Sequence, residues 1–85
     1  MSFKLSIVAP SGKVFEDTVD SIAVVGTEGA FEVYSKHTPI ISALKAGRAR
    51  VRKAGHETAY EITSGILEVD LEHNVIVLAD QATPA

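Results

Sequence analysis

The histidines are the side chains of this chain best suited to proton transfer or metal binding, and they lie in three separate turns. None of His37, His56 and His73 has a second histidine or a carboxylate at metal-ligand spacing nearby. A metal site needs three or four converging side chains, so the sequence predicts no metal site and no cofactor. His56 and His73 are expected to be solvated turn residues. For His37, beside Pro39, a second interpretation is open, in which it hydrogen-bonds a loop carbonyl or a partner.

The carboxylates form two candidate acid pairs. A glycosidase needs two carboxylates that face one cleft, but neighbouring strand residues point to opposite faces, so Glu16 and Asp17 are expected to diverge. Glu68 and Asp70 share a face, and they are expected to be solvated acids. The buried face of their strand is expected to consist of Leu67, Val69 and Leu71. No serine is marked as a nucleophile by a neighbouring base, so the sequence does not predict an enzyme.

The segment Gly26-Thr27-Glu28-Gly29 superficially resembles a phosphate-binding loop. A true P-loop requires a longer glycine-rich loop, followed by Lys and Ser/Thr at the start of a helix. Here a strand-like F-E-V-Y segment follows, and no Gly-Lys-Ser/Thr is present. The segment is therefore predicted to be a structural turn in which glycine provides a positive φ.

A basic stripe, Arg48, Arg50 and Arg52, shares one strand face through its i, i+2 spacing. Three interpretations are open: a solvent face salt-bridged to Glu57 and Glu61 on the next strand, a protein contact, or a phosphate-binding site. Nucleic acid is the least favoured partner because no aromatic residues are interleaved for base stacking. The net charge of −3 also lacks the basic footprint of nucleic-acid binding.

Length and composition indicate one small globular domain. The chain has 85 residues, 46% of them hydrophobic and 22% charged, and it has no cysteine. Without cysteine there is no disulfide, thiolate metal site or cysteine nucleophile. No apolar run approaches the roughly 20 residues that span a bilayer, and the first residues lack the features of a secretory signal.

Alternation of apolar and polar residues with period two runs through most of the chain, which favours strands over helices. Turn signals recur about every 8–12 residues, a spacing typical of an all-β sandwich or barrel. Only Thr38 to Lys45 is a candidate for a helical turn. One domain is expected over residues 1–80, followed by a flexible tail at 81–85 that has no core-forming pattern.

Five fragments, in this order and spacing, resemble the epsilon subunit of F-type ATP synthases, which is called delta in mitochondria. They lie at Leu5–Phe15, Val19–Gly29, His37–Gly47, Ser64–Val69 and Asn74–Asp80. The resemblance covers nearly the whole chain. It implies a flattened β-sandwich of about ten short strands that corresponds to the N-terminal domain of that family and has no catalytic residues.

The resemblance also implies a function and two partners. It suggests a non-catalytic rotor subunit at the foot of the central stalk, with one side against the gamma subunit and one end on the polar loops of the membrane c-ring. Such a subunit couples proton-driven rotation to ATP synthesis. It would be peripheral, on the cytoplasmic, matrix or stromal face of the energy-transducing membrane, with no direct insertion into the bilayer and no nucleic-acid partner.

Carried over by position, two groups of residues are expected to bind these partners. The loop that rests on the ring is expected to contain Glu28, Gly29, Ala30 and Phe31, with Glu32 substituting for the acid that is frequent at the Ala30 position. The segment near gamma is expected to comprise His37 and Thr38–Leu44, including Ile40 and Leu44. Ser35 and Lys36 depart from the family pattern, which tends to have proline and glycine there.

Most members of that family continue into a C-terminal helical hairpin that regulates ATP hydrolysis. This chain ends five residues after Asp80, so we expect it neither to bind ATP through such a hairpin nor to insert one into the catalytic head. Two other hypotheses remain. One is a free-standing β-sandwich module that binds acidic ligands through the three arginines, and the weaker one is a small hydrolase with His37 as base.

Overall fold

The computed structural model describes residues 1–85 and contains ten strands and no helix. The strands are β1 (Phe3–Ala9), β2 (Gly12–Val19), β3 (Ser21–Gly26), β4 (Gly29–Tyr34), β5 (Ile40–Leu44), β6 (Gly47–Lys53), β7 (His56–Ile62), β8 (Gly65–Val69), β9 (Val75–Ala79) and β10 (Ala82–Pro84). The predicted all-β sandwich is therefore confirmed.

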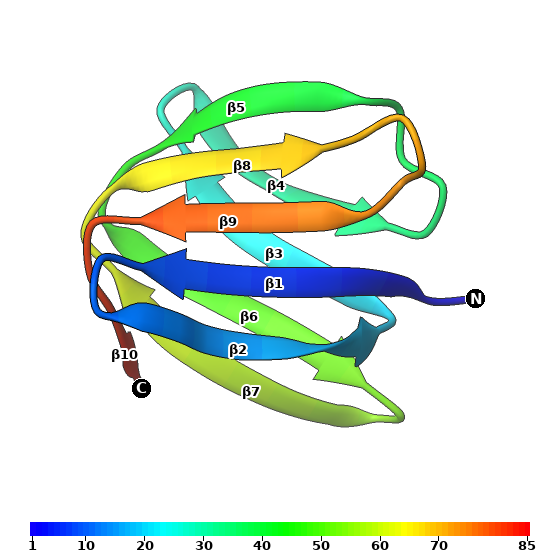
Figure 1. Cartoon of the computed structure of the whole chain (residues 1–85), viewed down its shortest axis with the longest axis horizontal. Helices are drawn as coiled ribbons and strands as arrows, with labels where there is room; N and C mark the ends of the chain where they lie inside the picture. The colour runs from blue at the N-terminus through cyan, green and yellow to red at the C-terminus, as the bar shows by residue number, and fades with distance from the viewer.

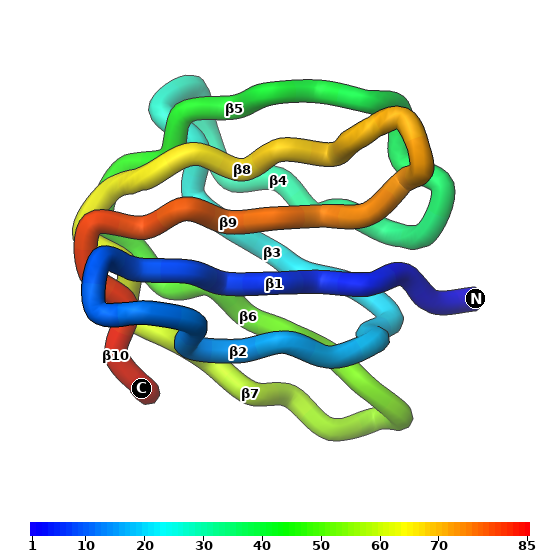
Figure 2. The backbone as a smooth tube through the Cα atoms, in the orientation of Figure 1, coloured from blue at the N-terminus to red at the C-terminus, as the bar shows by residue number.

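The strands form two layers that share one continuous hydrogen-bonded path. One layer, here called the front layer, has the order β5-β8-β9-β1-β2, and the back layer has the order β4-β3-β6-β7-β10. Figure 1 shows the front layer nearest the viewer, with β3, β4, β6 and β7 behind it, and Figure 2 traces the same path as a tube. The two layers join where Gly26 of β3 pairs with Leu44 of β5.

The core lies between the layers and follows from the alternation of the strands. In β1, Phe3, Leu5 and Ile7 are buried, while the residues between them face outward or lie half-buried. Seventeen buried hydrophobic residues from both layers make one cluster. Burial of such aliphatic side chains contributes about 1.5–3 kcal/mol each, so the sandwich depends on every strand keeping its register.

The strand after Gly65 buries Leu67 and Val69 as predicted, but the prediction that Leu71 is also buried was wrong. Leu71 is 85% exposed because β8 ends at Val69 and the chain turns at Asp70. The Asp70 carboxylate accepts hydrogen bonds from the backbone amides of Glu72 and Asn74, both at 2.9 Å. These bonds fix a tight turn that directs Leu71 away from the core.

The candidate for a helical turn, Thr38 to Lys45, contains a strand instead. Residues Ile40–Leu44 form β5 and pair antiparallel with β8, from Ile40 opposite Val69 to Leu44 opposite Gly65. Cross-strand pairing therefore overrides the weak local preference of this segment.

The expected flexible tail at 81–85 also differs in the structure. Ala82–Pro84 form β10, which pairs with β7 in the register Ala82 opposite Ile62 to Pro84 opposite Tyr60. Ala85 donates a backbone hydrogen bond to Ala59 at 2.9 Å. The free edge of the back layer accommodates this strand, and a proline without an N–H is tolerated at such an edge.

One glycine is required by the packing of the front layer, which generates a first prediction. A Cβ at Gly65 would overlap the carbonyl oxygen of Leu78 and lie 3.0 Å from the Cα of Ala79. Because both contacts are backbone atoms of the paired strand, Gly65→Ala should lower the free energy of unfolding by about 1–3 kcal/mol. Urea denaturation measures this change. Ile66→Ala, at the next and outward-facing position, is the control and should cost less, so an equal loss in both variants would contradict the assigned register.

Candidate interaction surfaces

The β3–β4 hairpin tip, at residues 27–28, is exposed at the end of the sandwich where β5 finishes. The Thr27 amide donates to the Ala43 carbonyl and the Lys45 amide to the Val25 carbonyl, both at 3.0 Å. Gly29 has φ = +131°, a conformation that only glycine adopts readily. Glu28 is therefore presented by an anchored turn, as predicted, and its carboxylate has no ion-pair partner.

The strand after the tip, β4, separates the residues expected to contact the ring into two faces. Ala30 and Glu32 point outward, whereas Phe31 is half-buried. Its ring lies 3.0 Å from the position that a Cβ on Gly26 would occupy. The tip and Ala30 are therefore accessible to a partner, while Phe31 supports the hairpin from inside.

Glu32 is already engaged within the back layer. Its carboxylate accepts a hydrogen bond from the Tyr34 hydroxyl at 2.8 Å, and this bond raises the pKa of the Tyr34 phenol. Ala23 lies between Glu32 and Arg50 in the cross-strand register. Glu32 thus contributes negative charge to the middle of β4 rather than to the tip.

The loop between β4 and β5 lies at the opposite end of β4 from the tip, as Figure 1 shows. His37 Nδ1 donates to the carbonyl of Thr38 at 2.7 Å, which is the loop-carbonyl bond proposed from the sequence. Lys36 has φ = +62°, in the position where the family tends to have glycine. A lysine thus holds a left-handed backbone conformation in this loop.

His73 was expected to be solvated, and this prediction was wrong. It is half-buried, and its Nδ1 donates to the carbonyl oxygen of His37 at 3.0 Å. The turn after β8 is therefore fastened to the β4–β5 loop (right side of Figure 1). His56, in contrast, is exposed in the β6–β7 turn as predicted.

Within β5, the structure divides the residues expected to contact gamma. Leu44 is only 5% exposed and belongs to the core, and Ile40 is half-buried against it. Thr38 is exposed, and so are Ile41 and Ala43, which the sequence prediction did not single out. Strand alternation is the signal that would have found them, since Ile41 and Ala43 occupy the face opposite Ile40 and Leu44.

The outer face of the front layer carries a row of apolar residues that crosses four neighbouring strands. In register from β5 to β1, the row consists of Ala43, Ile66, Leu78 and Val8. Ile66 is 44% and Leu78 47% exposed. Single exposed aliphatics are ordinary on protein surfaces, whereas a contiguous row is a candidate interaction site. We call this row, together with Ile41 and Ile76, the apolar face.

The outer face of the back layer is charged, and its charges are paired. Arg48 Nε lies 2.7 Å from Glu61, and Arg50 and Arg52 lie 3.2 and 3.7 Å from Glu57. The prediction of salt bridges across this hairpin is confirmed. Exposed pairs of this kind contribute about 0–1 kcal/mol each, and they leave fewer guanidinium donors for an acidic ligand.

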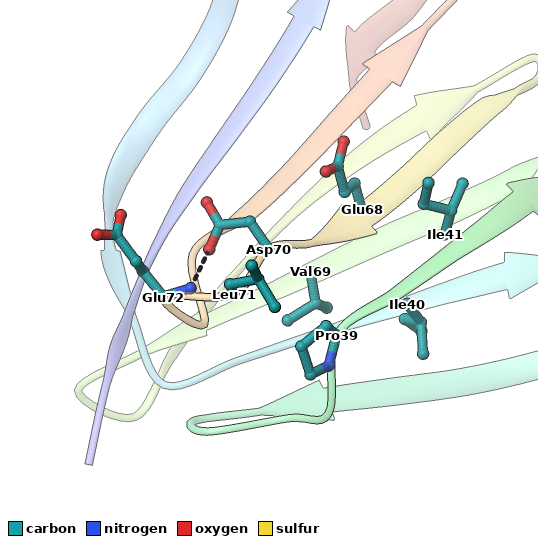
Figure 3. Close-up of a pocket in the computed structure, with 8 residues that line it drawn as sticks. All are labelled: Pro39, Ile40, Ile41, Glu68, Val69, Asp70, Leu71 and Glu72. Atoms are coloured by element: carbon teal, nitrogen blue, oxygen red, sulfur yellow. Dashed lines mark hydrogen bonds between the residues drawn. The ribbon is translucent and has the colours of Figure 1, made fainter.

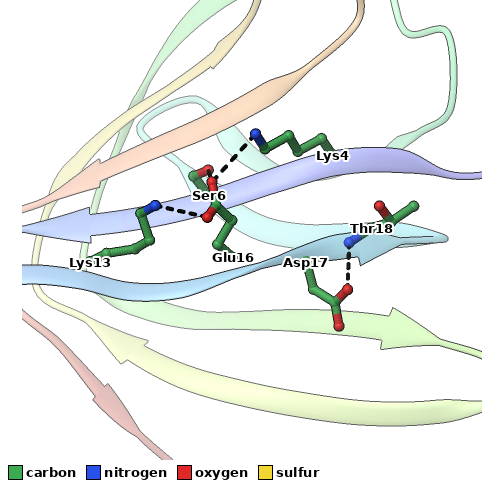
Figure 4. Close-up of polar contacts among 6 residues, drawn as sticks. All are labelled: Lys4, Ser6, Lys13, Glu16, Asp17 and Thr18. Carbon is green, nitrogen blue, oxygen red and sulfur yellow. Dashed lines mark hydrogen bonds and ion pairs between the residues drawn. The ribbon is translucent and has the colours of Figure 1, made fainter.

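Glu16 and Asp17 diverge, as the sequence predicted. Glu16 bonds to Lys13 at 2.7 Å and lies 3.5 Å from Lys4 (Figure 4). Asp17 lies 2.7 Å from Lys53 of β6 and accepts the Thr18 amide at 2.7 Å. The Lys13 and Lys53 hydrogen bonds lower the pKa of Glu16 and Asp17, respectively. The Asp17 pair also connects β2 of the front layer to β6 of the back layer.

Together these features define a β-sandwich module, with an apolar row on one layer, ion pairs on β1, β2 and the other layer, and two ends formed by turns. No group of three or more His, Cys, Asp or Glu side chains lies together in a way that could hold a metal ion. The structure also has no helix with the length and hydropathy needed to cross a bilayer.

The comparison with known families assigns this module. Residues 2–85 match the family described as the ATP synthase delta/epsilon chain, beta-sandwich domain. The chain therefore belongs to the ATP synthase delta/epsilon family and consists of its β-sandwich domain, in agreement with the resemblance found in the sequence.

Among the solved structures with the same fold are two of mitochondrial ATP synthases. A chain in the Euglena gracilis OSCP/F1/c-ring structure matches with a TM-score of 0.91 at 21% identity, over 98% of this chain and 53% of that one. A chain in the Tetrahymena thermophila central stalk/c-ring structure matches with a TM-score of 0.81 at 12% identity, over 96% of this chain and 66% of that one. This chain thus spans about half to two thirds of the chains that it matches.

The hairpin tip generates a second prediction. A Cβ at Gly29 would contact nothing within 4 Å, so Gly29→Ala should cost only backbone strain, about 1–2 kcal/mol. Thermal and urea unfolding measure this cost. Ala30→Val, at the neighbouring exposed strand position, is the control and should be neutral, because β-branched residues suit strands. Equal stability of the Gly29→Ala variant and the wild type would refute the strained turn.

The paired carboxylates generate a third prediction. Because the pKa values of Glu16 and Asp17 are lowered from 4.5 and 3.8 in the folded state, their stabilisation is present above those values and is lost as the pH falls through the folded pKa values. The Glu16→Gln/Asp17→Asn variant should therefore lose less stability than the wild type between neutral pH and about pH 3. Urea titrations across this range measure the difference, and parallel curves for the two proteins would contradict it.

Proposed function

We propose that this chain is a non-catalytic subunit of the central stalk of a proton-translocating F-type ATP synthase, and that it links the gamma subunit to the membrane c-ring. The family match supports the assignment to this enzyme, and the similar structures from Euglena gracilis and Tetrahymena thermophila both include a c-ring. In this function the chain transfers torque and does no chemistry of its own.

The observation that carries the proposal is the asymmetry between the two outer faces. Cross-strand pairs between arginine and glutamate occupy the back layer, whereas β5, β8 and β9 of the front layer expose Ile41, Ile66 and Leu78, and the ion pairs of that layer lie on β1 and β2. Burial of apolar area is the dominant favourable term in stable protein association. The apolar face is therefore the surface on which we place gamma.

The ring contact is assigned to the hairpin tip, because the tip lies at an end of the sandwich rather than on a face. Glu28 is exposed there without a cationic partner, on a turn anchored to β5. Its carboxylate suits a basic group on a polar ring loop, and Ala30 adds a small exposed surface beside it. Because the face and the end belong to one rigid body, the domain can hold two partners at once. It does so outside the bilayer, at the membrane surface.

This arrangement predicts that a charge placed on the apolar face will weaken gamma binding. Leu78→Lys should lower the affinity for purified gamma at least tenfold, since a lysine in the centre of an apolar interface costs more than about 1.4 kcal/mol. Calorimetric titration of each variant with purified gamma measures this loss of affinity. The fold should be unaffected because Leu78 is 47% exposed.

Thr83→Lys, on β10 of the back layer, adds the same charge away from the apolar face and is the matched control. In reconstituted ATP synthase, Leu78→Lys should also reduce proton-driven ATP synthesis, whereas Thr83→Lys should not. Two results would refute the proposed function: wild-type protein without affinity for gamma, or full proton-coupled synthesis by an enzyme from which the chain has been deleted.

A further inference from the structure

A groove of about 640 Å³ lies beside the apolar face, where β5 begins and β8 ends. Pro39 and Ile41 border it on the β5 side, and Glu68 and the turn from Asp70 to Glu72 border it on the other. Figure 3 shows the carboxylates of Glu72, Asp70 and Glu68 following one another along the groove, with Ile41 beside Glu68. The groove therefore combines aliphatic walls with an acidic rim.

Its aliphatic side chains are unusually exposed. Ile41 is 74% and Leu71 85% exposed, more than either Ile66 or Leu78. The turn that carries Leu71 is held by the amide hydrogen bonds to Asp70 and by a third bond at 3.0 Å, from the His73 amide to the Asp70 carbonyl. Because this turn is already ordered, a partner that covers Leu71 loses little conformational entropy on the side of this chain.

The acidic rim has no cationic partner within ion-pair distance, a property that it shares with Glu28 and Glu32 of the β3–β4 hairpin but not with the acids of the ion-pair clusters. Glu16, Asp17, Glu57 and Glu61 all have a lysine or arginine within 4 Å, and no rim carboxylate does. The strand register explains why Glu68 has no cationic partner, because its cross-strand neighbours are Ile41 on β5 and Ile76 on β9.

One lysine, Lys4, lies near this rim but is not within ion-pair distance of it. Lys4 borders an adjoining hollow with Glu68 and Asp70, but its ion pair is with Glu16, at 3.5 Å. Unpaired carboxylates beside a surface create a local negative potential that attracts cationic groups and repels anionic ones. The same potential disfavours an anionic lipid surface and a second copy of this chain, whose net charge is −3.

From these observations we infer that the groove is the docking site for a basic, amphipathic segment of gamma. An aliphatic side chain of that segment packs between Ile41 and Leu71, and its lysine or arginine groups face Glu68 and Glu72. This inference rests on the proposed function, because it takes gamma as the partner. It adds the chemistry of the contact, which the apolar face alone does not specify.

The test measures the kinetics of gamma binding to variants of the complete chain at about 50 mM and about 500 mM salt, since screening weakens exposed charge interactions. Leu71→Ser should raise the dissociation rate and weaken affinity about tenfold. Glu68→Gln/Glu72→Gln should lower the association rate about tenfold at low salt and little at high salt, because rim charges act mainly on encounter.

Each variant has a matched control on the back layer. Tyr34→Ser removes a large exposed side chain, and Glu57→Gln/Glu61→Gln removes two glutamate charges. Both should bind gamma with about the wild-type rates and salt dependence. All the altered side chains are exposed or at the surface, and circular dichroism with melting curves verifies that every variant is folded.

Three results would overturn the inference. If the groove variants bind gamma like the wild type while Leu78→Lys still weakens binding, the groove assignment is wrong and the proposed function stands. If the wild type has no affinity for gamma, both fail together. If Leu71→Ser instead abolishes self-association or flotation with phosphatidylserine vesicles, the groove belongs to a second copy or to a lipid surface.

Discussion

The structure depends on the burial of alternate residues between two thin layers of strands. In a chain of 85 residues the core is modest, and nearly every strand contributes to it through a single face. The opposite face of each strand is then available for other uses. On that face β5, β8 and β9 expose aliphatic residues, while β1, β2 and the back layer expose ion pairs, so these surface properties reside in residues that contribute little to folding.

The length of β4 sets the distance between the two candidate contact regions at its ends. Its six residues extend over about 20 Å, with the Glu28 turn at one end and the His37 loop at the other. In sequence these regions are separated only by the short strand-like F-E-V-Y segment. In the folded molecule the first is anchored to the end of β5, and the second is anchored to the turn after β8 through His73.

Much of the fold was predictable because period-two alternation is a strong signal in a sandwich. The same signal does not show where a strand stops. Leu71 continued the pattern of Leu67 and Val69, but the hydrogen bonds of Asp70 end the strand first. Residues 82–84 have no apolar pattern that predicts a strand. An edge strand of three residues forms without one, because it needs only a neighbouring strand with free backbone groups.

The candidate site was harder to predict, because its properties come from register rather than from composition. Glutamates occur on both layers, but β6 and β7 align Arg48 with Glu61, whereas β5 and β9 place isoleucines on both sides of Glu68. One set of acids is thus neutralised within the molecule and the other is not. No inspection of a single strand reveals this difference, because it arises only when the strands pair. It is this pairing that leaves Glu68 between two isoleucines, without a cation opposite it, at the groove beside the apolar face.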